Sequence, residues 1–221
     1  ETSNKYPQET MEVNILGTQN VLEASRLENI ERFLFASTIY VYSELGSFYK
    51  VSKQSSEKII EEYQKQFNLD YTILRFGSIY GPRSNNFNSI NLMLNQALND
   101  KKIIRPGDGE EIREYIHVKD AAKLSMNALD KKFINKHLII TGIEKIRIKD
   151  LVSMINEIFG GEIKVEFGKE IDEYHYSITP YNYKPQIAKK VIADAYYDLG
   201  QGLLDQIYDI KSNLKILDKK Q

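Results

Sequence analysis

The sequence predicts an α/β protein built around a doubly wound parallel sheet, and two observations support this fold class. Short apolar segments of the kind that form buried strands alternate along the chain with longer segments of helical periodicity. A helix between two such strands provides the crossover that parallel pairing requires. From about Ser78 onward the pattern becomes more mixed, which indicates a second, smaller α+β region.

Each predicted strand is a short run of apolar residues. The runs RFLFA, YTILRF and HLIIT are typical of strands buried in a parallel sheet. The sequence Pro-Gly-Asp-Gly at residues 106–109 has the chemistry of a turn, so we expect two strands around it. The predicted strands cover residues 32–36, 71–76, 102–105, 112–118, 137–141 and 163–167.

The predicted helices have apolar residues at helical spacing. In the first helix one apolar stripe is formed by Val13, Leu16, Val21, Leu22 and Ala24. The last helix contains Gly200 and Gly202, which are unfavourable inside a helix. The predicted helices cover residues 9–27, 49–67, 88–98, 119–129, 148–159 and 194–210.

The composition argues against several classes of protein. The 221 residues include 30 basic and 31 acidic side chains, so a basic face for nucleic acid or for an anionic membrane is disfavoured. Cysteine is absent and the three histidines lack metal-ligand spacing, so we expect no disulfide and no metal site. No apolar run approaches the roughly 18 residues of a membrane span, and the first residues are polar. We therefore expect a cytoplasmic protein that binds neither nucleic acid nor membranes.

The residues most suggestive of chemistry lie around the start of the second predicted helix. Tyr49 and Lys53 are four residues apart, which places both side chains on one helix face, with about 5–6 Å between their Cβ atoms. A lysine ammonium one turn away favours the phenolate, so we expect it to lower the pKa of the tyrosine. Thr38 follows an apolar strand at its carboxyl end, where open α/β sheets bind ligands. Its hydroxyl is placed to share the proton of a substrate.

Together with their neighbours, these residues resemble the extended short-chain dehydrogenase/reductase family, in its NAD-dependent sugar-nucleotide epimerase/dehydratase branch. The resemblance covers residues 9–129 well. It implies a Rossmann-like doubly wound sheet, here without its N-terminal strands. The segments that carry it are 13–24, 37–42, 49–53, 75–83 and 107–120, in the order of the family.

The resemblance also divides the chain by function. It implies a partial Rossmann-like cofactor domain at residues 1–77 and 112–135. The substrate-binding region is then formed by residues 78–111 and 136–221. In such enzymes the tyrosine removes a proton from a sugar hydroxyl while hydride passes to the cofactor, which gives catalytic roles to Tyr49, Lys53 and Thr38.

Further site residues follow from the same resemblance. It implies that the cofactor is bound by Asn14, Ser37, Tyr49 and Lys53, and the substrate by Thr38, Ser78 and Arg113. A polar residue at a helix end is the alternative for Asn14, and an exposed strand residue is the alternative for Arg113. Ser78 stands where many relatives have a substrate-binding asparagine. His175 and Tyr176 are candidates to close over the sugar nucleotide.

The chain departs from the family in its glycines. The glycine-rich fingerprint that lets a backbone approach a pyrophosphate is absent, and the family carries it before the first helix seen here. The chain therefore looks truncated at its N-terminus. NAD is the expected cofactor, and NADP remains an alternative because the residue that distinguishes them would precede this chain.

The expected reaction is 4-epimerisation of a nucleotide sugar such as a UDP-hexose, through a 4-keto intermediate. Dehydratases of this branch have an acidic pair directly after the threonine, and here those positions are Ile39 and Tyr40. The alternatives are an NAD(P)-dependent reductase or dehydratase of a nucleotide sugar, or a non-catalytic member of the fold. The helices at 9–27 and 49–67 match those that pair across a dimer in relatives, so a homodimer is expected.

Overall fold

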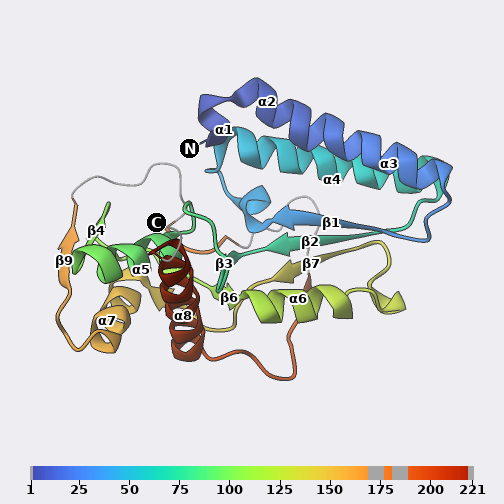
Figure 1. Ribbon diagram of the computed structural model, residues 1–221. Coiled ribbons are helices and arrows are strands. Elements are labelled where there is room, and N and C mark those ends of the chain that lie inside the picture. The colour runs from blue at the N-terminus through green and yellow to red at the C-terminus, as the bar shows by residue number, and fades with distance from the viewer. Residues whose placement is uncertain (1, 169–176, 181–188, 219–221) are drawn as a thin grey trace. The chain divides into compact units, whose positions relative to one another are not determined.

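A computed structural model describes residues 2–168, 177–180 and 189–218 of the chain (Figure 1). The chain folds into two compact units. The first contains the described parts of residues 1–77, 124–140 and 173–192, and the second contains those of 78–123, 141–172 and 193–221. This division differs from the predicted one at residues 112–123, which belong to the second unit, and at residues 136–140, 177–180 and 189–192, which belong to the first.

The first unit contains the predicted parallel sheet. Its strands are β1 (Phe33–Thr38), β2 (Tyr71–Phe76), β7 (Lys136–Ile140) and β10 (Lys189–Lys190), in the order β1-β2-β7-β10. All three strand pairs are parallel, and the last residues of β1, β2 and β7 lie in register. The doubly wound parallel sheet predicted from the sequence is therefore confirmed, and the carboxyl ends of its strands share one edge.

Helices cover one face of this sheet (Figure 1). The first predicted helix is a continuous helical segment with a π-helical turn in its middle, because α2 (Pro7–Met11) leads through η1 (Glu12–Leu16) into α3 (Gly17–Leu27). It is preceded by α1 (Thr2–Lys5) and packs on α4 (Ser47–Phe67). The core beneath these helices consists of Leu22, Phe35, Ile60, Leu69, Tyr71 and Ile73.

The apolar stripe predicted for the first helix is only partly buried. Leu22 is fully buried, whereas Val13 is 65%, Leu16 53% and Val21 54% exposed. A helix of this kind has room for only one buried face against α4 and the sheet, so these three residues face outward. The predicted stripe is therefore buried at Leu22 and exposed at these three positions.

The second unit combines three small sheets with helices. Strands β3 (Ser78–Tyr80) and β6 (Tyr115–His117) pair in parallel, as do β4 (Lys102–Arg105) and β9 (Lys164–Phe167). Strand β5 (Ile112–Arg113) pairs antiparallel with β8 (Ile146–Arg147). Of the two strands expected around the turn at 106–109, the first is β4 and the second is divided into β5 and β6. Strands β4 and β5 pair with later strands and β6 with the earlier β3, so the expected strands do not pair with each other. The helices are α5 (Ser89–Asp100), α7 (Ile148–Ile158) and α8 (Leu199–Asp218), and α6 (Val118–Asn127) and the short η3 (Lys131–Phe133) lead back to the first unit.

Helix α8 begins five residues later than predicted, because Asp198 caps it. The Asp198 carboxylate accepts a hydrogen bond from the backbone N–H of Gln201 at 2.9 Å. Inside the helix, a Cβ at Gly202 would lie 2.5 Å from the Tyr80 hydroxyl, so this glycine permits a close approach to β3. Among the described residues, no helix is long and apolar enough to cross a membrane.

Candidate functional site

The three predicted catalytic residues come together at the carboxyl edge of β1. Thr38 is the last residue of this strand and caps the short helix η2 (Ile39–Tyr42). Tyr49 and Lys53 lie in the first two turns of α4. The Tyr49 hydroxyl forms a hydrogen bond with the Thr38 side chain. The spacing predicted from the sequence therefore corresponds to one cluster in the first unit.

A glycine allows the chain to turn sharply into α4. Gly46 has a φ of +103°, and a Cβ on it would lie 2.8 Å from the Tyr40 ring. That ring in turn meets the Tyr49 ring edge-on, with 6.4 Å between the centroids. Because a side chain at position 46 would push against Tyr40, Gly46 permits the packing that holds the Tyr49 ring.

The pKa of Tyr49 is raised, which corrects the expectation from the sequence. Loss of water around the hydroxyl raises this pKa, and the hydrogen bond with Thr38 opposes the rise only in part. The Lys53 Nζ atom lies 6.0 Å from the centroid of the Tyr49 ring. It donates instead to the backbone carbonyl of Ala36 at 3.0 Å. In this state the ammonium therefore does not outweigh the desolvation of the phenol.

Lys53 is itself perturbed by its surroundings. Burial lowers the pKa of Lys53, and the negative charge of Glu57 one turn further along α4 partly restores it. The ammonium lies 4.8 Å from the centroid of the Phe35 ring. Among the described residues Ala36 is its only hydrogen-bond acceptor, so further N–H groups of the ammonium are available to a ligand.

Asn14 connects the first helix to α4. It lies in the π-helical turn, and its amide donates to the Ser52 hydroxyl at 2.9 Å. Its backbone carbonyl accepts from the hydroxyls of Ser56 at 2.8 Å and Thr18 at 2.6 Å. Asn14 is thus inside the helical segment rather than at a helix end, and π-helical turns are often found at functional sites. Its role toward a cofactor stays a prediction.

Ser37 is occupied by the protein interior. Its side chain is buried, and its hydroxyl donates to Glu57 at 2.5 Å. The hydroxyl is therefore engaged with a carboxylate of α4. Contact of Ser37 with a cofactor stays a prediction.

Two of the three predicted substrate residues, Ser78 and Arg113, belong to the second unit. Arg113 lies on β5 and is buried, with its guanidinium donating to the carbonyl of Ile112 at 3.2 Å. The alternative of an exposed strand arginine is therefore wrong. Ser78 begins β3 and pairs with Tyr115 of β6. His175 and Tyr176 lie outside the described residues.

Sequence reasoning missed a buried polar cluster beneath α4. Arg75 of β2 forms an ion pair with Glu57 of α4, with side chains that are 3% and 5% exposed. His137 of β7 lies next to both. One signal was present in the sequence, because Tyr49, Lys53, Glu57 and Glu61 follow each other at four-residue steps on one helix face.

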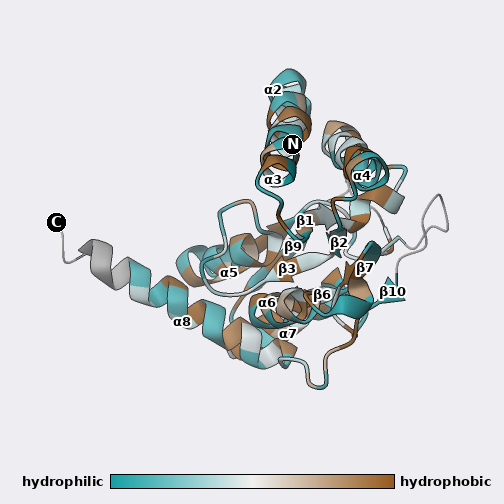
Figure 2. Cartoon of the chain, turned by 90° about the vertical axis from the view of Figure 1, so that its right-hand side faces the viewer, coloured by the Kyte–Doolittle hydropathy of each residue, from teal (hydrophilic) through white to brown (hydrophobic). Residues whose placement is uncertain are grey.

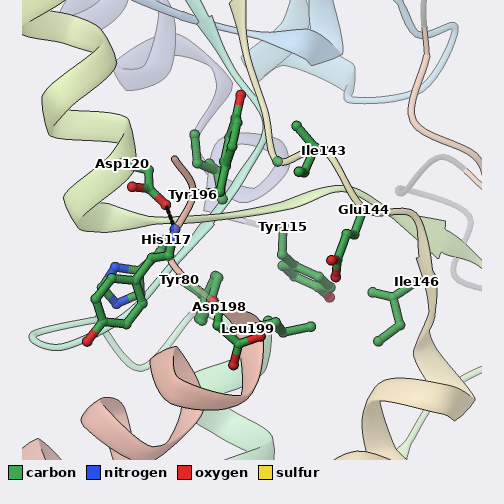
Figure 3. A pocket seen from close by; sticks show the side chains of 13 residues that line it. Tyr80, Tyr115, His117, Asp120, Ile143, Glu144, Ile146, Tyr196, Asp198 and Leu199 are labelled. Carbon is green, nitrogen blue, oxygen red and sulfur yellow. Dashed lines mark hydrogen bonds between the residues drawn. The ribbon is translucent and has the colours of Figure 1, made fainter. Parts of the chain in front are cut away.

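The second unit contains a pocket with a volume of about 270 Å³ (Figure 3). Tyrosines and carboxylates dominate its wall, and Asp120 accepts a hydrogen bond from the backbone of Tyr197 at 2.6 Å. His117 is buried and its ring stacks on the Tyr197 ring, with 4.1 Å between the two centroids. This is the environment of a histidine packed on a strand. The residues that the structure describes include no group of three or more side chains that could hold a metal ion.

The fold and the site together define a class of protein. A parallel sheet with a threonine at the carboxyl end of one strand, and a tyrosine–lysine pair on the helix that follows, is the arrangement of a short-chain dehydrogenase/reductase domain. The chain belongs to the NAD-dependent epimerase/dehydratase family, whose model matches residues 1–140.

Individual relatives support this assignment. An uncharacterised UDP-glucose epimerase of Bacillus subtilis, YtcB, is 32% identical over 72% of this chain and 54% of its own length. The structure of a UDP-glucuronic acid 4-epimerase mutant from Bacillus cereus, in complex with UDP-4-deoxy-4-fluoro-glucuronic acid and NAD, is 27% identical with a TM-score of 0.78. The aligned region covers 90% of this chain and 67% of the Bacillus cereus chain.

The fold also recurs at lower identity. A UDP-glucose 4-epimerase from Thermotoga maritima has a TM-score of 0.81 at 21% identity, over 96% of this chain and 74% of that one. This likeness concerns the fold alone. The chain spans about half the length of the curated relatives it matches.

The described residues fit one end of the family's cofactor. The Lys53 ammonium and the Tyr49 hydroxyl lie at the carboxyl edge of β1, and an ammonium and a phenol are chemically suited to the hydroxyls of a ribose. The sequence contains no glycine-rich loop for the pyrophosphate end. The fit is therefore limited to the nicotinamide end.

Proposed function

We propose that the protein is a nucleotide-sugar 4-epimerase that works with NAD. The observation that carries this proposal is the assembly of Thr38, Tyr49 and Lys53 at the carboxyl edge of β1. The relatives named for UDP-glucose and UDP-glucuronic acid epimerisation support the substrate class. UDP-hexoses are therefore the first substrates to test.

In this proposal Tyr49 removes the proton from the hydroxyl at C4 of the sugar. Thr38 holds the Tyr49 hydroxyl through their hydrogen bond and orients the sugar alcohol. Lys53 binds the ribose hydroxyls of the nucleotide through its available N–H groups. The bound NAD would accept and return a hydride, and its positive ring would favour the phenolate form of Tyr49. Burial raises the pKa of Tyr49 above its ordinary value, so a neighbouring positive charge would help this residue to act as a base.

The residues after Thr38 favour epimerisation over dehydration. Ile39 is buried in a cluster with Val41, Tyr42 and Ile139. Tyr40 packs its ring against Tyr49. Neither side chain is a carboxylic acid, so the paired acid and base that water loss requires are missing at these positions.

Arg113 and Ser78 are proposed to bind the substrate. A guanidinium suits the oxygens of a diphosphate, and the burial of Arg113 limits its motion. The proposal predicts that Arg113→Lys raises the KM for the nucleotide sugar, because the planar fork is lost while the charge stays. Adding NADP in place of NAD tests the choice between the two nucleotides.

A homodimer is also proposed, formed through the helices on the open face of the first unit. Apolar residues lie along α3 and α4 (Figure 2). Val13, Leu16 and Val21 are more than half exposed, and Val51 of α4 is 43% exposed. Exposed apolar side chains gathered on neighbouring helices are typical of a protein–protein contact.

The test is incubation of the complete protein with NAD and a panel of UDP-, GDP- and dTDP-hexoses. Inversion at C4 without net consumption of NAD supports the proposal. Net oxidation of NADH or NADPH with a keto sugar would indicate a reductase, and a 4-keto-6-deoxy product would indicate a dehydratase.

The remaining alternative is a non-catalytic member of the fold. A ligand that binds only the native state raises the melting temperature. The epimerase proposal predicts thermal stabilisation by NAD and by at least one UDP-sugar. The proposal would be contradicted if no sugar of the panel gave either thermal stabilisation or turnover.

A further inference from the structure

A buried polar cluster connects α4 to three strands of the first unit. It consists of Ser37, Tyr42, Glu57, Glu61, Arg75 and His137, and all six side chains come from the first unit. The helix that it holds is the one that carries Tyr49 and Lys53 (Figure 1). None of its members is among the proposed reacting groups, although Glu57 lies one turn from Lys53 and its charge raises the pKa of that lysine.

The centre of the cluster is a two-point ion pair between a helix and a strand. Arg75 of β2 donates from Nε to Glu57 Oε1 at 3.0 Å and from Nη2 to Glu57 Oε2 at 2.6 Å. It also donates to the Tyr42 hydroxyl. The Ser37 hydroxyl of β1 donates to the same Glu57 carboxylate at 2.5 Å. Parallel bonds between a guanidinium and a carboxylate fix orientation as well as distance.

His137 extends the cluster to a third strand. Its Nδ1 lies 2.7 Å from Arg75 Nη2, and because a guanidinium can only donate, Nδ1 accepts. The ring proton is therefore on Nε2, which lies 3.3 Å from Glu61 Oε1. Glu61 is one turn beyond Glu57, so α4 places carboxylates beside His137 at two successive turns.

These contacts lie on the same face of α4 as the proposed reacting groups. We infer that Glu57 and Arg75 are positioning residues, whose buried pair fixes the rotation and the height of α4 on the sheet and thereby sets Tyr49 and Lys53 against Thr38. Glu57 is two turns from Tyr49, and a continuous helix transmits a rotation at one turn to the next. A shift of about 1 Å between reacting groups can cost about 100-fold in rate.

Stability alone does not explain a pair of this kind. Replacing a buried ion pair by uncharged side chains of similar volume is often neutral or stabilising. Apolar packing alone is also less directional than two parallel hydrogen bonds. The pair therefore contributes a defined geometry that a purely apolar contact would not.

The test is a double variant, Glu57→Gln/Arg75→Met, which removes both charges together. This inference rests on the proposed epimerase activity. We expect cooperative unfolding near the parent melting temperature, a kcat about 100-fold lower and a KM for the nucleotide sugar within threefold of the parent. A purely structural role would leave kcat unchanged in a variant that is folded. A folded double variant with kcat within threefold of the parent would overturn the inference.

A second variant covers the case in which the double variant does not fold. Glu57→Asp keeps the charge and shortens the side chain by one methylene, and we expect a fall of at least tenfold in kcat with KM retained. A kcat within threefold of the parent would again overturn the inference. The matched control is Glu62→Gln, which breaks an exposed ion pair with Lys65 on the same helix and should leave kcat unchanged.

Failure of the inference and failure of the proposed function give different results. If Tyr49→Phe keeps full turnover, the proposed function is wrong whatever the cluster does. If Tyr49→Phe is inactive and both Glu57 variants keep full kcat, only the positioning role is wrong.

Discussion

At the scale of single residues, the proposed chemistry depends most on the surroundings of the Tyr49 hydroxyl. Its hydroxyl is held by Thr38, and partial burial raises its pKa, so the free chain holds it as a neutral phenol. This is suitable for a group that must become a base only when a positively charged cofactor is beside it. The lysine one turn away contributes less than its spacing suggests, because its ammonium is bound to the Ala36 carbonyl.

Removing the Tyr49 hydroxyl should abolish turnover. We expect Tyr49→Phe to lower kcat by about 10²–10⁴-fold, the usual contribution of a positioned acid–base group, and to leave the melting temperature close to that of the parent. Steady-state assays of C4 inversion measure the effect. Tyr63→Phe is the matched control, because it removes a hydroxyl on the same helix that binds Glu23 at 3.2 Å. Retained epimerisation in Tyr49→Phe would contradict the assignment.

Glu61 should make stability depend on pH in the acid range. Burial opposes its ionisation, but His137 and Lys58 lower the pKa of Glu61 to about 2. Its contribution is therefore complete above about pH 4.5, the ordinary value, and is lost as the pH falls toward 2.

Urea unfolding at a series of pH values measures this contribution. We expect Glu61→Gln to be less stable than the parent at pH 7 and to lose less stability between pH 4.5 and 2. Glu62→Gln, with an exposed side chain, is the control and should follow the parent. Parallel pH curves for the parent and Glu61→Gln would exclude the role assigned to Glu61.

At the scale of elements, helix α8 and strand β3 approach each other unusually closely. Gly202 makes this possible, since a Cβ there would lie within 2.5–2.9 Å of three atoms of the Tyr80 ring and hydroxyl. Tyr80 is almost fully buried and has little room to move away. The two glycines that weakened the prediction of this helix therefore differ in their roles.

Gly202→Ala should destabilise the protein by about 1–3 kcal/mol, the usual cost of overpacking a core. Thermal or urea unfolding of the variant measures it. At Gly200 a Cβ would meet only the flexible end of Asp198 at 3.2 Å, so Gly200→Ala should be near neutral. Equal effects of the two substitutions would show that helix propensity, and not the contact with Tyr80, decides the outcome.

At the scale of the whole molecule, the proposed homodimer depends on the exposed apolar residues of the first helix. We expect Val13→Glu/Leu16→Glu to dissociate the proposed homodimer, because two charges would be buried in an apolar contact. Light scattering coupled to gel filtration measures the mass. Leu92→Glu, on an exposed position of α5 that is 49% accessible, is the control. A parent protein that is already monomeric would refute the homodimer.

Much of the fold could be predicted from local patterns. Strands β2 and β4 have the predicted bounds, and helix α4 ends at Phe67 as predicted. The pairing of β4 with β9 could not be predicted, because it joins residues 102–105 to 164–167 across intervening helices. Strand partners depend on how whole elements pack, which local sequence does not encode.

The candidate site was predictable to the same extent. The sequence predicted that Thr38, Tyr49 and Lys53 lie close together, from the four-residue spacing of the last two and the position of Thr38 after a strand. The structure places the three residues in one cluster. The direction of the Tyr49 pKa was wrong, because desolvation depends on the atoms that surround a group in the fold.

The sequence by itself therefore determined the class of fold, the order of its elements and the three residues at the strand edge, since periodicity and short-range spacing are local properties. Only the tertiary structure decided which side chains are withdrawn from water and which distant residues meet. Glu57, Arg75 and His137 are far apart in the chain, and they meet because α4 packs on β1 and β2 while β7 lies next to β2 in the sheet. Buried charges require such partners, and a partner is supplied by packing rather than by neighbouring residues.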